Sequence, residues 1–179
     1  MAWPAKNTFG DLISSMVGGS RWSPSSVAWK CTSFLNLAGC FLRGKIFFFA
    51  DFEKADLSGA YLGWAALLVA NLQEANLEKA VLESAVLDHA NCRDARFCGA
   101  NLRRASLSGS RFQGADLRDA NLEGADLSGA DLLDAKIERA NFADAKLLGA
   151  VWVNGKRVIS GSVGELVFEE LDQAASEEP

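Results

Sequence analysis

From Ala50 to about Asn154 the sequence carries an apolar residue at every fifth position, without a single insertion. Two places before each of these apolar centres stands a small residue, which is alanine everywhere except at Ser110. A period of five matches neither the 3.6 residues of a helical turn nor the two-residue alternation of a strand. Short straight segments joined by regular corners do match it. The pattern therefore predicts an all-β solenoid, in which each coil buries its apolar side against neighbouring coils.

The charged residues indicate how many five-residue segments make one turn. Residues one full turn apart in such a solenoid lie about 4.8 Å from each other, so opposite charges should pair. Within the repeat, an offset of twenty gives nine opposite-charge pairs and one like-charge pair, whereas an offset of fifteen gives six against five and an offset of twenty-five gives one against seven. This predicts four segments per turn. One inward stack then comprises Phe52, Leu72, Cys92, Phe112, Leu132 and Trp152.

The twenty-one consecutive units of the form A(D/N)LXX resemble the pentapeptide-repeat family. The passage ADLRDANLEGADLSGA, from Ala115 to Ala130, is close to that family's consensus. The resemblance covers about three fifths of the chain and implies a right-handed quadrilateral β-helix, with the small residue and the central Leu or Phe stacked inside. It implies no single activity. The best-understood members resemble double-stranded DNA and inhibit or protect type II topoisomerases, while many others have no established role.

The chain divides into three expected parts: an N-terminal capping segment over residues 1–35, the repeat over 36–154, regular from 50, and a C-terminal part over 155–179. Ser23 and Pro24 form a helix start in the first part. In the last part, residues 153–156 predict a turn leading away from the coil. Ser162 and Glu165 form a capping box, which predicts a short helix from about 163 to 173. Both helices would cover the open ends of the solenoid, and the final residues are expected to fray.

Outward-facing apolar residues gather in the first regular coils. With a turn of twenty residues, Tyr61 lies over Val81 and Ala66 over Val86, which makes the group contiguous. Two interpretations stay open: residues 1 to 35 fold back over this group, or it is a surface for a partner or for self-association. The group comprises Tyr61, Trp64, Leu68, Val69, Val81 and Val86.

The sequence offers little material for catalysis. An active site needs a nucleophile, a base or a metal held in a concavity. His89 is the only histidine and is expected to face solvent beside Asp88. The four cysteines have no metal-type spacing; Cys40 and Cys92 fall at inward positions, and Cys98 is expected to face solvent. We therefore expect no enzymatic activity, no cofactor and no metal site.

Charge is banded along the predicted rod. Five arginines lie between residues 92 and 111, and the next coil is mainly acidic, with Asp116, Asp119, Glu123, Asp126, Asp131 and Asp134. A DNA mimic should be continuously negative, because the groove of a topoisomerase is basic along its length. The arginines also lack the interleaved aromatic residues of a nucleic-acid-binding surface, so direct binding of nucleic acid is not expected.

These observations predict a non-enzymatic solenoid that is a rigid binding surface for another protein. The alternative is a DNA-mimicking modulator of DNA gyrase or topoisomerase IV. The amino terminus lacks the pattern of a secretory signal, and the run from Cys40 to Phe49 is short and includes Arg43 and Lys45. We therefore expect a cytoplasmic protein without a membrane span. It would be a monomer or, because some family members pair in this way, a dimer formed through the C-terminal end.

Overall fold

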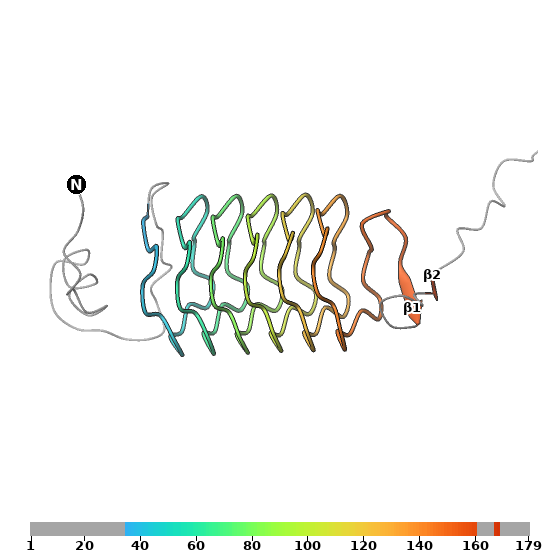
Figure 1. Ribbon diagram of the computed structural model, residues 1–179, viewed down its shortest axis with the longest axis horizontal. Helices are drawn as coiled ribbons and strands as arrows, with labels where there is room; N and C mark the ends of the chain where they lie inside the picture. The colour runs from blue at the N-terminus through green and yellow to red at the C-terminus, as the bar shows by residue number, and fades with distance from the viewer. Residues whose placement is uncertain (1–34, 161–166, 169–179) are drawn as a thin grey trace, which may run out of the picture.

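The computed structural model describes residues 35–160 and 167–168, and residues 35–154 stack as successive coils along one axis (Figure 1). Each coil takes twenty residues, since parallel β-bridges join residues twenty apart from Asn36 and Asp56 through Asp131 and Val151. This register confirms the turn of four segments inferred from the charges. The coils comprise residues 35–54, 55–74, 75–94, 95–114, 115–134 and 135–154, and are called coils 1 to 6.

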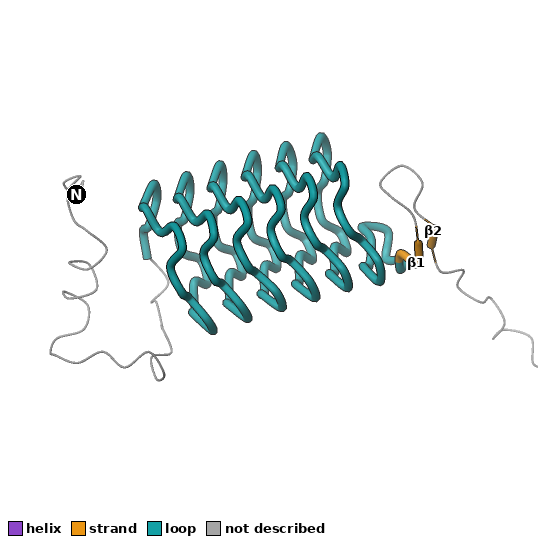
Figure 2. The backbone as a smooth tube through the Cα atoms, turned by 90° about the horizontal axis from the view of Figure 1, so that it is seen from below, coloured by secondary structure: helices purple, strands orange, loops and turns teal. Residues whose placement is uncertain are grey.

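The four segments of each coil give the solenoid, called the tower below, four faces. Every segment is too short to form a longer strand, so the coils are drawn as loops in Figure 2. The faces are numbered in chain order by their bridging residues. Face 1 contains residues 36, 56, 76, 96, 116 and 136; face 2 contains 41, 61, 81, 101, 121 and 141; face 3 contains 46, 66, 86, 106, 126 and 146; face 4 contains 51, 71, 91, 111, 131 and 151.

One segment shows how the sequence makes a side and a corner. The N–H of Leu57 donates to the carbonyl of Asn76 in the next coil at 2.7 Å, and its side chain is fully buried. The side chain of Asp56 accepts the N–H of Ser58 at 3.0 Å, which bends the chain after the centre. Gly59 then closes the corner with a φ of 62°. Asp and Asn recur before many centres because their side-chain oxygen supports this corner, although the corners at Trp64 and Val69 form after Tyr61 and Ala66 without it.

The core is a set of inward columns, one for each face and one for each corner. In the face 4 column Phe52, Leu72, Cys92, Phe112 and Leu132 are buried. Trp152 is only half-buried because coil 6 has no further coil above it, and its ring packs on Phe142 at 5.5 Å between centroids. Ser110, the exception among the small residues, is buried and donates its hydroxyl hydrogen to the carbonyl of Leu107 at 2.5 Å. Its polar atom is therefore satisfied.

Coil 1 follows the same plan although its sequence is irregular. Leu37, Leu42 and Phe47 are buried as its centres, while Lys45 stands exposed at a position that holds alanine in the regular coils. Its bridging residues pair with coil 2 in the register of the other coils. The solenoid therefore extends back at least to Asn36.

At the C-terminal end the chain folds back along the edge of coil 6. The N–H of Gly155 donates to the carbonyl of Trp152, and Arg157 bridges antiparallel to Val151. Strand β1 (Val158–Ser160) starts there, and the N–H of Gly149 donates to the carbonyl of Val158 at 2.7 Å. The turn predicted at residues 153–156 is present, but the prediction that it leads away from the coil is wrong. The returning chain instead pairs with backbone groups at the open edge.

The helix predicted from about 163 to 173 is also wrong where that segment is described. Val167–Phe168 forms strand β2, which pairs antiparallel with β1 (Figure 1). The capping box is a local signal, whereas β1 offers an edge whose hydrogen-bonding groups must be paired. Valine and phenylalanine favour that pairing. The helix predicted after Ser23 lies outside the described residues.

Replacing Leu102 by aspartate should destabilise the protein by at least about 4 kcal/mol, because it places an unpaired carboxylate in a fully buried column. Asn101→Asp is the matched control. Asn101 accepts the N–H of Arg103 through Oδ1, and an aspartate can do the same. Urea unfolding followed by circular dichroism measures both variants. An unchanged midpoint for Leu102→Asp would contradict the buried assignment.

Candidate interaction surface

The outward apolar residues expected from the sequence lie on faces 2 and 3 of coils 2 and 3. Trp64 is 61% exposed, and Tyr61 and Val69 are also exposed. Leu68, Val81 and Val86 are half-buried between their neighbours. Tyr61 and Val81 bridge adjacent coils, as do Ala66 and Val86. The structure therefore brings this group together on two adjoining faces.

Four more apolar residues extend this group into coil 1. Phe41 is 77% exposed, and its ring stacks on that of Tyr61 with 4.7 Å between centroids. Ile46, Phe48 and Phe49 are exposed on face 3. The sequence analysis missed them because they precede the regular repeat, although the five-residue register continued backwards places each at an outward position. We call the whole group the N-terminal apolar surface: Phe41, Ile46, Phe48, Phe49, Tyr61, Trp64, Leu68, Val69, Val81 and Val86.

The charges near this surface change sign along the tower. Coil 1 contributes the cations Arg43 and Lys45, and coil 2 contributes no charged residue to faces 2 and 3. The first acidic residues on these faces are Glu83 and Asp88 in coil 3. The apolar surface thus has a basic end and an acidic end.

The backbone at this surface is strained. Phe49, Trp64 and Val69 close corners with φ of 58°, 61° and 58°. Val69 is the only β-branched residue with positive φ in the part of the chain that the structure describes. Such a residue is held there at a cost of about 1 to 3 kcal/mol. Glycine closes many other corners without this cost.

The acidic residues of coil 5 do not form an open acidic surface, because four of the six have cationic partners. The hydrogen bond from Arg118 lowers the pKa of Asp116, and the hydrogen bond from Arg139 lowers the pKa of Asp119. The partners are Arg118 for Asp116, Arg139 for Asp119, Arg103 for Glu123 and Lys146 for Asp126. Asp131 accepts from the side chain of Gln113.

The ion pairs only partly follow the twenty-residue offset. Four of the nine predicted pairs form: Lys54–Glu74 at 3.7 Å, Arg103–Glu123 at 3.0 Å, Asp119–Arg139 at 2.5 Å and Asp126–Lys146 at 3.2 Å. Arg96 pairs with Glu78 instead of Asp116, and Arg118 pairs with Asp116 in its own segment instead of Glu138. Long side chains choose among several near partners, so the offset fixes the coil but not the partner.

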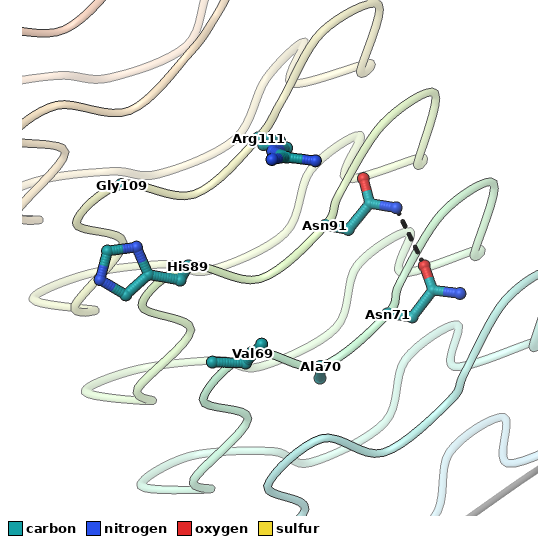
Figure 3. Close-up of a pocket in the computed structure, with 7 residues that line it drawn as sticks. All are labelled: Val69, Ala70, Asn71, His89, Asn91, Gly109 and Arg111. Carbon is teal, nitrogen blue, oxygen red and sulfur yellow. Dashed lines mark hydrogen bonds between the residues drawn. The ribbon is translucent and has the colours of Figure 1, made fainter.

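A shallow pocket at the corner between faces 3 and 4 shows no catalytic arrangement (Figure 3). His89 and Arg111 line it but extend in different directions, and Asn91 donates to Asn71 at 3.1 Å. The imidazole of His89 covers Gly109 of the next coil, where an added Cβ would be 2.5 Å from Nδ1. Among the lining residues no second acid or base faces His89. The arrangement is that of surface packing.

The described residues hold no group of three or more His, Cys, Asp or Glu side chains placed to bind a metal ion. Burial raises the pKa of the Cys92 thiol, and Cys98 is half-buried. Over the same residues, no helix is long and apolar enough to cross a membrane.

Comparison with known proteins identifies a matching family and several solved structures that are similar to this chain. The family model for pentapeptide repeats matches residues 33–63, 70–104 and 105–144 in eight copies. Comparison with curated protein sequences gives no match. Similar solved structures include HetL from the cyanobacterium Nostoc sp. strain PCC 7120, a pentapeptide repeat protein involved in heterocyst differentiation regulation, with 32% identity and a TM-score of 0.37. The alignment covers 68% of this chain and 61% of HetL, so the chain spans less than two thirds of that relative.

Two further structures are similar over comparable lengths. AT2G44920, a pentapeptide repeat protein of the Arabidopsis thaliana thylakoid lumen, is 27% identical with a TM-score of 0.48, over 61% of this chain and 69% of its own. Trypsin-treated QnrB1, a plasmid-mediated fluoroquinolone resistance protein, is 18% identical with a TM-score of 0.53, over 67% of this chain and 74% of its own. The likeness to QnrB1 concerns the fold alone.

Val69→Gly should raise the free energy of unfolding by about 1 kcal/mol, since glycine adopts the positive φ without strain and this gain exceeds its entropic cost. Gly129→Val is the reciprocal control. A Cβ at Gly129 meets no atom within 4 Å, so any loss of stability there reports the φ of 67° alone. Denaturant unfolding of both variants provides the measurement. A Val69→Gly protein less stable than the parent would show that the valine is held by packing.

Proposed function

The chain belongs to the pentapeptide-repeat family, and we propose that it acts without catalysis as a rigid surface that binds another protein. Proteins of this family form right-handed quadrilateral β-helices and are generally structural or interaction proteins. The support for this function comes from the side chains that this chain exposes on its own faces.

The observation that carries the proposal is the N-terminal apolar surface. Contiguous large apolar side chains on a protein surface mark sites of interaction, and tryptophan and tyrosine often contribute most of the binding energy. Trp64, Phe41 and Phe49 are each more than half exposed. Val69 of this surface is the only β-branched residue at a positive-φ corner among the described residues, so it is retained at a cost to stability.

The rest of the tower supports a scaffold rather than a catalyst. Backbone hydrogen bonds join every coil to the next, so the surface is presented on a rigid support and little ordering is needed on binding. The free thiols of Cys40, Cys92 and Cys98 are compatible with a reducing compartment, and we place the protein in the cytoplasm.

The charge distribution argues against the alternative of DNA mimicry. Face 1 runs from Arg96 through Asp116 to Lys136, and face 4 places Arg111 beside Asp131. Most acidic residues of coil 5 are also paired. A supercoiling assay with purified DNA gyrase provides the check, and we expect neither inhibition nor drug protection. Either effect at low micromolar protein would favour mimicry instead.

Trp64→Asp should abolish capture of the partner, since it places a carboxylate in the middle of the apolar surface. Leu148→Asp is the matched control, because Leu148 is 64% exposed on face 3 at the other end of the tower. Affinity capture from cells of the source organism, read by quantitative mass spectrometry, should retain one protein with the parent and with Leu148→Asp but lose it with Trp64→Asp. A large fall in the melting temperature of Trp64→Asp alone would show that another part of this chain covers the indole.

A further inference from the structure

We propose that a second copy of this chain binds to face 2 of coils 1 to 3, antiparallel to the first, with a two-fold axis along the coil 2 segment that begins at Tyr61. The inference rests on the proposed function, because it identifies the protein partner with this chain itself. A two-fold interface uses the same patch on both copies, so the patch must be complementary to itself.

The symmetry makes a definite pairing of residues. Rotation about an axis along the coil 2 segment keeps every side chain in its column and places coil 1 of one copy over coil 3 of the other. Tyr61 then meets Tyr61 of the second copy, and Phe41 meets Val81 of the second copy. These three residues form the bridging column of face 2, with Phe41 stacked on Tyr61. The column is apolar over its whole contact length.

The charges of face 2 fit this arrangement. Arg43 in coil 1 and Glu83 in coil 3 occupy one column, each one coil away from Gly63. Within the described residues, neither forms an ion pair. Arg103, the cation next to Glu83 in that column, is bound to Glu123 at 3.0 Å. In the dimer Arg43 of each copy faces Glu83 of the other, which gives two symmetric pairs.

Gly63 lies at the proposed axis between these two charges. Its φ is not positive, so the backbone does not require glycine there. The same column carries the side chains of Arg43, Glu83, Arg103 and Glu123 in neighbouring coils. Because Gly63 has no side chain, the surface of face 2 is recessed between Arg43 and Glu83, at the point where the two copies would approach most closely. Trp64 lies at the edge of this recess. Glycine at such a place allows close contact between backbones.

The size of the patch determines how the dimer should behave. Three coils extend over about 14 Å of the tower, at about 4.8 Å per coil. The buried area is therefore below the roughly 800 Å² per partner of a stable interface. The dimer should form reversibly at micromolar or higher concentration, and its formation is measurable by sedimentation velocity of the full chain from about 5 to about 500 μM.

Charge reversal tests the register. Arg43→Glu and Glu83→Arg should each weaken dimerisation at least tenfold, because each places like charges opposite one another. The double variant Arg43→Glu/Glu83→Arg should restore it, since the pair is re-formed with reversed signs. Lys79→Glu is the control, because this exposed lysine lies on face 1 and forms no ion pair among the described residues. It should leave dimerisation unchanged.

A disulfide test locates the axis. Gly63→Cys should give an intermolecular disulfide under mild oxidation, and an added Cβ there meets only the carbonyl of Glu83 at an ordinary 3.5 Å. Ser58→Cys on face 1 should remain monomeric under the same conditions. Equal cross-linking of the two variants would show random collision and overturn the assignment.

Three results would overturn the proposal. The first is a monomer at all concentrations; if Trp64-dependent capture of another protein persists in that case, the proposed function stands and only the dimer fails. The second is a dimer that is insensitive to both charge reversals, which would place the contact elsewhere, including the C-terminal end. The third is binding of the monomer to phosphatidylglycerol vesicles that is lost in Trp64→Asp, which would make a lipid surface the occupant.

Discussion

The backbone hydrogen bond between each coil and the next is the interaction on which the structure depends. The bond from Leu57 to Asn76 recurs along every face with almost the same length. For it to recur, the chain must return above itself after twenty residues, which requires a corner at every fifth residue. The corners in turn require positive φ angles, and an Asp or Asn oxygen before the centre supports many of them. The repeated letters of the sequence are thus the chemical requirements of one geometry.

That geometry leaves three positions in five free to vary, and the faces differ because of them. Faces 2 and 3 begin with aromatic and aliphatic side chains and become polar toward the C-terminal end. The middle of the tower carries arginines and carboxylates that largely neutralise one another. The core is uniform from coil to coil, so any selectivity of the protein must come from this uneven exterior.

The sequence was enough to predict the coil, its register and the inward columns, because these repeat and each repeat confirms the last. It was not enough for features that occur once. Arg118 pairs with Asp116 and not with Glu138, and the repeat register does not decide between two carboxylates that lie within reach of one flexible side chain. The strand at Val167–Phe168 depended on an edge supplied by Val158–Ser160, whereas the capping box at Ser162 and Glu165 reported only local preference. Phe48 and Phe49 were not predicted to belong to the apolar surface because the first coil is irregular, although the five-residue register places both at outward positions.

The antiparallel return of the chain at coil 6 also bears on the lifetime of the folded state. Each coil is hydrogen-bonded only to its immediate neighbours, so unfolding can start at one end of the solenoid and proceed inward coil by coil. At the C-terminal end the bonds between Gly149, Ala150 and Val158 must break before coil 6 can peel away. The returning segment therefore holds coil 6 in place. The stability of its hydrogen bonds sets how readily heat, a protease or a pulling force unfolds the solenoid from the C-terminal end.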